Sequence, residues 1–209
     1  MRYARTVGAL FLFFWLSGAP RAARAEAVRY QIDSTASRVL IHVGKAGLLS
    51  FAGHEHEVVA PKIHGSVAAD PDQPAQASVD VTFDASALRV TGAGEPAQDV
   101  AEVQKTMLGP ECLDVERFPT IRFVSTSVAP AGEEAGTRRL AIHGSLTLHG
   151  VTRPVTLNAR VDFESDSIEA SGVLAVRQTD FGIKPISKAG VVNVKDELDI
   201  KWRLVGRRP

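Results

Sequence analysis

The sequence predicts an all-β fold, either a closed antiparallel barrel or a sandwich, with one short helix. Over residues 140–163, apolar side chains recur at every second position on both sides of Gly150. A period of two places the apolar residues of a strand on one face. About ten short segments of this kind follow one another along the chain, which is the spacing typical of barrels and sandwiches. A single segment, 99–108, breaks this period.

The strand candidates share alternating apolar residues and are separated by short polar or glycine-containing stretches. We expect strands at 28–32, 38–43, 54–60, 63–67, 78–83, 87–90, 121–128, 168–176 and 198–205, and in both halves of 140–163. The two halves of 140–163 form an antiparallel hairpin around a turn at 150–154. Each such strand has one apolar and one polar face.

The exceptional segment, 99–108, is predicted to be a helix. Asp99 is followed three residues later by Glu102, which is the pattern of a capping box. Apolar residues at helical spacing follow, and the Gly-Pro pair at 109–110 ends the segment. A closed sheet has an open mouth at each end, so we expect this helix to cover one of them.

The first 25 residues have the pattern of a secretory signal peptide. Arg2 and Arg5 precede an apolar core at 7–16, and a small-x-small cleavage site lies at 23–25. An uncleaved anchor is the alternative, but the apolar core is shorter than the roughly 20 residues that span a bilayer. We therefore expect an exported, non-membrane-spanning chain with a single domain at 26–209.

Charge and cysteine content exclude two further classes of function. Without the leader's four arginines, 20 basic residues remain against 24 acidic ones, so the chain is mildly acidic. This balance argues against a nucleic-acid partner. The single cysteine, Cys112, has no partner for an internal disulfide. Its acidic neighbours are expected to raise its thiol pKa, which predicts a packing residue rather than a reactive thiol.

Four segments together resemble the YceI-like family of exported lipid-binding proteins. They are YQID at 30–33 with SRV at 37–39, RFPTIRF at 117–123, GSLTLHGVTRPV at 144–155, and RQTDFGI at 177–183. Their order and spacing match the family along nearly the whole mature chain. The resemblance implies an extended, lipocalin-like antiparallel barrel whose lumen holds a long apolar molecule, typically an isoprenoid or a related lipid. It also implies export to the periplasm and carriage rather than chemistry.

Alternation alone leaves open whether the barrel is packed with side chains or hollow, and the resemblance favours a hollow one. A lumen that binds lipid needs a continuous apolar inner face. We predict that this face includes Ile41, Val81, Phe83, Phe123, Leu146, Leu148, Phe163 and Trp202. The expected ligand is an isoprenoid, a quinone or a fatty amide, held for storage or transport. A packed barrel would instead be a structural envelope protein.

The segment 53–60 departs from the family pattern, because it contains two histidines and two glutamates at 54–57. On a strand, His54 and His56 project from one face about 6.6 Å apart, a spacing that suits one divalent metal ion. Three interpretations remain open: polar rim residues, a pH-sensitive gate, and a metal or haem site. A zinc site needs at least one more ligand. The candidates are His42, His64, His143 and His149.

The sequence points to no catalytic residues. It contains no Gly-x-Ser-x-Gly nucleophile elbow, no P-loop and no dinucleotide fingerprint. We therefore expect a binding protein without a cofactor, unless His54 and His56 hold a metal. The alternative is a metal-dependent redox or hydrolytic protein that uses this His-x-His site. Both a monomer and a homodimer are compatible with the sequence.

Overall fold

The computed structural model describes residues 27–46, 55–188 and 192–209, and this part is built almost entirely from strands. The strands are β1 (Val28–Ile32), β2 (Arg38–Ala46), β3 (His56–Val59), β4 (Ile63–Ala69), β5 (Ser78–Asp84), β6 (Arg89–Val90), β7 (Thr120–Glu134), β8 (Thr137–Leu148), β9 (Val151–Phe163), β10 (Ser167–Arg177), β11 (Ser187–Lys188) and β12 (Val192–Arg207). The α-helix of this part is α1 (Val100–Leu108), and short 3-10 turns lie at Pro74–Gln76, Ala85–Ala87 and Gln178–Phe181.

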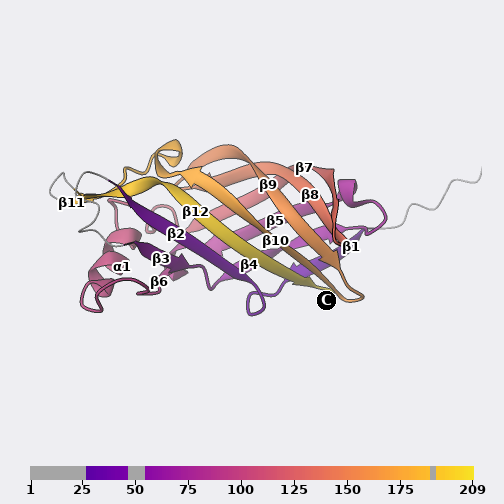
Figure 1. The fold of residues 1–209 in the computed structure, drawn as a ribbon, viewed down its shortest axis with the longest axis horizontal. Coiled ribbons are helices and arrows are strands. Elements are labelled where there is room, and N and C mark those ends of the chain that lie inside the picture. The colour runs from indigo at the N-terminus through magenta and orange to yellow at the C-terminus, as the bar shows by residue number, and fades with distance from the viewer. Residues whose placement is uncertain (1–26, 47–54, 189–191) are drawn as a thin grey trace, which may run out of the picture.

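Eight antiparallel strands close into a barrel, as the sequence predicted. The order is β1-β4-β5-β7-β8-β9-β10-β12, and pairing of Gln31 with Arg207 and of Ile32 with Gly206 joins the last strand to the first. The barrel is elongated: α1, β3 and β6 lie at one end, and the β7–β8 hairpin and the C-terminus lie at the other (Figure 1). Closure gives every strand of this ring a neighbour on each side, although β9 and β10 pair only over 158–163 and 168–173.

Near α1 the wall of the barrel is made by additional strands. One edge of the long strand β12 pairs first with β2, from Asn193 to Arg203, and then with β1. β2 in turn pairs with β3, and β3 pairs with the short strand β6. The α1 end therefore contains β2, β3 and β6, which are distant in sequence from the β7–β8 and β8–β9 hairpins.

The helix α1 covers the outer edge of β6 through one side chain. The Gln104 amide oxygen accepts a hydrogen bond from the Val90 backbone N–H at 2.8 Å, and its amide nitrogen donates to the Leu88 carbonyl oxygen at 2.9 Å. Gln104 thus replaces the two hydrogen bonds that a neighbouring strand would supply. The prediction that the helix lies at a mouth of the barrel is confirmed.

The capping box predicted at the start of this helix is wrong. The helix begins at Val100, and the Asp99 side chain makes no capping hydrogen bond. Asp99 has a helical backbone conformation, with φ −89° and ψ −22°, whereas a capping residue is normally extended. Its carboxylate is therefore free of the helix end, and it lines the interior of the barrel together with Glu102.

The β8–β9 connection is shorter than predicted. Instead of five turn residues at 150–154, two residues suffice, His149 and Gly150, both with positive φ (50° and 71°). Positive φ at both central positions is typical of the type I′ turn, whose twist matches that of the strands it joins. Pro154 lies inside β9, in the part that β10 does not pair, so its missing N–H costs no bond to that neighbour.

Other boundaries differ from the predictions by a few residues. Strands β7 and β12 run well beyond 121–128 and 198–205, with bulges after Ser125, after Pro130 and after Val194. The predicted strand at 87–90 shortens to Arg89–Val90, because Ala85–Ala87 forms a 3-10 turn. The Asp84 carboxylate accepts a hydrogen bond from the Ser86 N–H and so begins this turn. The prediction of a strand at 54–60 begins outside the described residues.

Candidate ligand-binding site

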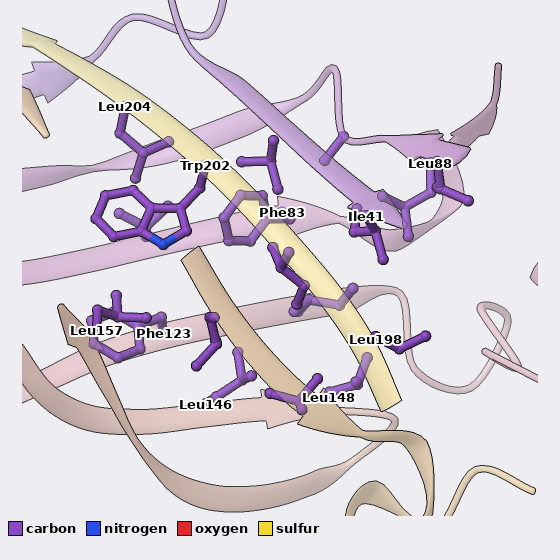
Figure 2. A pocket seen from close by; sticks show the side chains of 18 of the residues that line it. Ile41, Phe83, Leu88, Phe123, Leu146, Leu148, Leu157, Leu198, Trp202 and Leu204 are labelled. Carbon is purple, nitrogen blue, oxygen red and sulfur yellow. The ribbon is translucent and has the colours of Figure 1, made fainter. Parts of the chain in front are cut away.

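The barrel is hollow and contains a cavity of about 540 Å³. This is a volume typical of sites that bind small molecules. Every strand of the closed ring contributes inward-facing residues to it, and the cavity extends from Ile168 and Gly206 near β1 to the residues of α1. Figure 2 shows part of its wall, where leucine, isoleucine and aromatic side chains face one another across the lumen.

The structure places all eight predicted lumen residues on the wall of this cavity. They are Ile41, Val81, Phe83, Phe123, Leu146, Leu148, Phe163 and Trp202. The period-of-two argument therefore identified the inner face of β2, β5, β7, β8, β9 and β12. Contact of these residues with a bound molecule stays a prediction.

Two aromatic rings shape the middle of the lumen by packing over glycines. A Cβ added at Gly144 would lie 2.5 Å from the ring of Phe123, and one added at Gly172 would lie 2.7 Å from the ring of Trp202. A side chain at either position would push the ring away. The indole nitrogen of Trp202 is buried and has no hydrogen-bond partner among the described residues, so an N–H donor faces the otherwise apolar interior.

The residues that close the cavity at the α1 end could not be assigned from the sequence. Val103 and Met107 of the helix, Leu88 before β6, and Leu113 after the helix supply its apolar part. The helical spacing of Val103 and Met107 indicated an apolar stripe, but nothing local indicated what the stripe would face. The polar part consists mainly of Glu95, Asp99, Glu102 and Thr106, together with His56.

His56 and Glu95 form a close pair inside this end of the cavity. His56 lies on β3 on the same face as Val58, and its Nδ1 is 2.9 Å from Oε1 of Glu95. The side chain of Glu95 is 1% exposed and that of His56 is 21% exposed. The separation is that of an ion pair, but the two atoms are not aligned as a hydrogen bond. Among the described residues, neither carboxylate oxygen of Glu95 accepts one.

The loop that precedes α1 holds Glu95 in this position. The Thr91 N–H donates to the Glu57 carbonyl oxygen at 2.8 Å, and the Thr91 hydroxyl lies 3.0 Å from the Glu57 carboxylate. Gly92 and Gly94 have positive φ, 77° and 78°, which lets the loop turn tightly alongside β3. From the sequence, this stretch was expected only to be a flexible loop before the helix. Its contact with β3 joins residues 34 positions apart, and local sequence patterns do not reveal such a contact.

The histidines proposed as metal ligands have separate surroundings in the described part. Nε2 of His42 is 3.6 Å from a Glu55 carboxylate oxygen, and Nδ1 of His143 is 2.9 Å from the Thr156 hydroxyl. Across 27–46, 55–188 and 192–209, no three His, Cys, Asp or Glu side chains gather as a metal ion would require. His54 lies outside the described residues, so metal binding by His54 and His56 stays a prediction.

Cys112 also lines the α1 end of the cavity, where it is partly buried. Burial raises the pKa of its thiol to about 11. A raised thiol pKa was expected from the sequence, but its cause is the burial of Cys112 and not the neighbouring carboxylates. At neutral pH the side chain is therefore an uncharged thiol, which suits a packing residue in an apolar wall.

Three of the four sequence segments that carry the family resemblance, 117–123, 144–155 and 177–183, contact one another. The ring of Phe118 packs edge-on against His149, with centroids 4.6 Å apart, and His149 Nδ1 lies 3.3 Å from the Phe181 carbonyl oxygen. Arg153 Nε donates to the Asp180 carbonyl oxygen at 2.9 Å. These segments support the β8–β9 turn and the 3-10 turn at Gln178–Phe181 and do not themselves form a reaction centre.

The remaining segment, YQID at 30–33 with SRV at 37–39, is hydrogen-bonded to β12. The Asp33 carboxylate accepts hydrogen bonds from the Thr35 hydroxyl at 2.7 Å and from Arg207 Nε at 2.8 Å. These bonds hold the pKa of Asp33 well below its usual range. The Ser37 hydroxyl accepts a hydrogen bond from the Val205 N–H, so both ends of the β1–β2 turn are fixed to the closing strand.

Comparison with known proteins agrees with this architecture. The YceI-like domain matches residues 30–205, which is most of the chain. The chain belongs to the YceI-like family. It is 36% identical over 127 residues to a UPF0312 protein of Enterobacter sp. (strain 638), covering 57% of this chain and 58% of that protein. It is 35% identical over 102 residues to Protein YceI of Salmonella arizonae, covering 49% of this chain and 47% of that protein. These matches span about half the length of the curated relatives.

Solved structures share the fold of this YceI-like chain. BcnA of Burkholderia cenocepacia superposes with a TM-score of 0.66 at 24% identity, covering 83% of this chain and 98% of BcnA. A polyisoprenoid-binding domain of Saccharophagus degradans superposes with a TM-score of 0.65 at 11% identity, covering 87% of this chain and 99% of that domain. Within the described residues, no helix has the length and apolar character needed to cross a membrane.

Proposed function

We propose that this YceI-like protein binds a long apolar lipid in the lumen of its barrel and stores or transports it in the periplasm. The ligand is an isoprenoid, a quinone or a fatty amide. The observation that carries the proposal is the continuous apolar cavity of about 540 Å³ that runs along the barrel. Support comes from the fold, which is also that of a polyisoprenoid-binding domain, and from the signal-peptide pattern at 1–25.

The energetics of apolar burial favour a long ligand. Each buried methylene contributes about 0.8 kcal/mol, so a ten-carbon tail gains about 8 kcal/mol. Association itself costs about 4–15 kcal/mol in lost freedom, which largely offsets that gain. A useful affinity therefore requires a chain longer than about ten carbons, and an elongated lumen is the shape that can enclose one.

The character of the wall supports carriage rather than catalysis. The middle of the lumen is lined by aliphatic and aromatic side chains, which offer contact area but no nucleophile. Cys112, the thiol on the wall, is kept in its unreactive form by burial. Such a site selects its ligand by length and shape.

The first test is to identify what the exported protein carries. The protein would be purified from the periplasm and extracted with organic solvent, and the extract would be analysed by mass spectrometry. A stoichiometric isoprenoid or long-chain acyl compound is the expected result. Trp202 supplies a second readout, because it is the only tryptophan in a chain that starts at Glu26, and it lies on the cavity wall.

For that readout, delipidated protein would be titrated with a long-chain isoprenoid while Trp202 emission is recorded. The expected result is a saturable change that the Trp202→Phe variant does not show. An empty extract together with an unchanged emission spectrum would overturn the proposal and favour a barrel without a ligand. Absence of the protein from the periplasmic fraction would contradict the proposed location.

A further inference from the structure

The polar groups of the cavity are concentrated at its α1 end. Glu95 lies in the loop before the helix, Asp99 and Glu102 lie at the helix start, and His56 lies opposite on β3. Lys45 on β2 is the other basic residue among the described cavity-lining residues. Three acidic residues therefore line this end of the lumen, of which Glu102 is exposed to solvent and Glu95 is buried, and no comparable charge lies along its middle.

Glu95 is incompletely satisfied in this position. A carboxylate is a hydrogen-bond acceptor with two oxygens, and burying it without donors is costly. The side chain is 1% exposed, and neither oxygen accepts a hydrogen bond from any described residue. His56 supplies a nearby ring nitrogen at 2.9 Å without hydrogen-bond alignment. A hydrogen-bond donor that approached from the cavity would satisfy this carboxylate.

The start of the helix does not turn this end into an anion site. A helix N-terminus attracts anions when its N–H groups and its partial positive charge are unopposed. Here Asp99 directly precedes the helix and Glu102 lies in its first turn, and both already offset that charge. A phosphate or carboxylate that entered from the lumen would meet the buried carboxylate of Glu95 first, with Asp99 and the more exposed Glu102 nearby.

We propose that the α1 end is a head-group subsite that selects lipids with a donating, non-anionic head, such as a hydroxyl or an amine. This inference rests on the proposed lipid-binding function and adds to it the chemistry of the ligand. The head donates to Glu95, and His56 stays beside the same carboxylate. The apolar tail extends from this point along the lumen toward Trp202 and Ile168. Fatty acids and polyprenyl phosphates are rejected by charge.

The test uses three probes that share one chain and differ only in the head: hexadecanol, hexadecylamine and hexadecanoate. Each would be titrated into delipidated protein at neutral pH, below its aggregation concentration, while Trp202 emission is followed. We expect the alcohol and the amine to bind about tenfold or more tightly than the carboxylate, because one favourable or repulsive charge contact is worth about that factor. This comparison needs no variant, so a folding defect cannot imitate its result.

The Glu95→Gln variant then assigns the preference to one side chain. It keeps the shape of the residue and removes its charge, so hexadecylamine should lose about tenfold in affinity and hexadecanoate should gain. Glu133→Gln is the matched control: Glu133 is exposed on the β7–β8 hairpin and does not line the cavity. It should change no affinity, and circular dichroism would confirm that both variants are folded.

The possible outcomes separate this inference from the broader function. Equal affinity of wild type for all three probes, or an unchanged preference in Glu95→Gln, would overturn the head-group subsite and leave lipid binding in place. No binding of any probe, together with an empty solvent extract, would overturn both proposals. Equal effects of Glu95→Gln and Glu133→Gln would show that the preference reflects overall charge, which also overturns the subsite.

Discussion

The middle of the lumen and its α1 end are built by different means and would recognise different parts of a ligand. The middle consists of inward-facing residues of hydrogen-bonded neighbouring strands, such as Phe123 and Leu146, which are paired across β7 and β8. The α1 end brings together a short strand, a loop and a helix, and it contains the buried pair His56 and Glu95. Apolar walls discriminate by length and shape, whereas a buried carboxylate discriminates by chemistry. In the proposed mode of binding, one cavity therefore separates these two kinds of selectivity in space.

The largest expected effect comes from placing a charge in the middle of the lumen. Leu148 is buried on the cavity wall, so Leu148→Arg should destabilise the protein by about 3 kcal/mol or more and abolish lipid binding. Thermal unfolding and the Trp202 titration would measure both effects. Thr147→Arg is the control on the opposite face of β8, and it should cost less than about 1 kcal/mol. Equal losses in both variants would mean that the two faces of β8 are not distinct.

A smaller effect is expected from adding one methyl group at the centre of the wall. In Gly144→Ala the new Cβ would lie 2.5 Å from the Phe123 ring and 2.5 Å from the Val124 carbonyl oxygen. One of these neighbours is backbone and cannot rotate away, so we expect a loss of about 1–3 kcal/mol in the free energy of unfolding. Denaturant unfolding would measure it, with a shifted Trp202 emission if Phe123 is displaced.

Gly44→Ala provides the control for that substitution. Its added Cβ would meet only the Lys195 side chain, at 3.3 Å, and a flexible side chain can move. This variant should therefore stay within about 0.5 kcal/mol of wild type. A loss as large as that of Gly144→Ala would show that any side chain at a strand glycine is harmful, irrespective of the lumen.

At the α1 end we expect an effect that is local rather than global. Gln104→Ala leaves the Val90 N–H and the Leu88 carbonyl oxygen without their partners, at a cost of about 1–2 kcal/mol. Amide exchange at Val90 should accelerate, while exchange at Leu146 in the central wall should change little. Lys105→Ala, on the neighbouring exposed position of the helix, should leave both rates unchanged. Equal acceleration at Val90 and Leu146 would show that the two regions open together.

The same contrast explains what the sequence could and could not predict. Alternation within a strand is local, so it identified the inward face that includes Ile41, Phe123 and Trp202, and it limited the fold to an antiparallel barrel or a sandwich. It could not decide between a filled and a hollow interior, since both need the same apolar face. The resemblance to the YceI-like family favoured the hollow barrel, and the cavity was then found in the structure.

The α1 end was poorly predicted because its contacts are long-range or depend on backbone geometry. His56 was interpreted together with its neighbour His54, yet its close partner in the described structure is Glu95, 39 positions later in the chain. Asp99 and Glu102 have the spacing of a capping box, but the helical backbone at Asp99 removes that role. The turn was predicted at 150–154, whereas the strand pairing places Pro154 inside β9, where its missing N–H is tolerated.

The smallest expected effect concerns Cys112, the partly buried thiol on the cavity wall. With a thiol pKa of about 11, the fraction of reactive thiolate is small at pH 7 and rises about tenfold per pH unit until the pH reaches that value. The rate of iodoacetamide modification of the folded protein should follow this rise, and unfolding in denaturant should restore the rate of an ordinary thiol. Cys112→Ala should change stability by less than about 1 kcal/mol and leave the Trp202 titration unchanged. Rapid modification at pH 7 would contradict the buried, uncharged thiol and would place Cys112 at a solvent-accessible position instead of in the apolar wall.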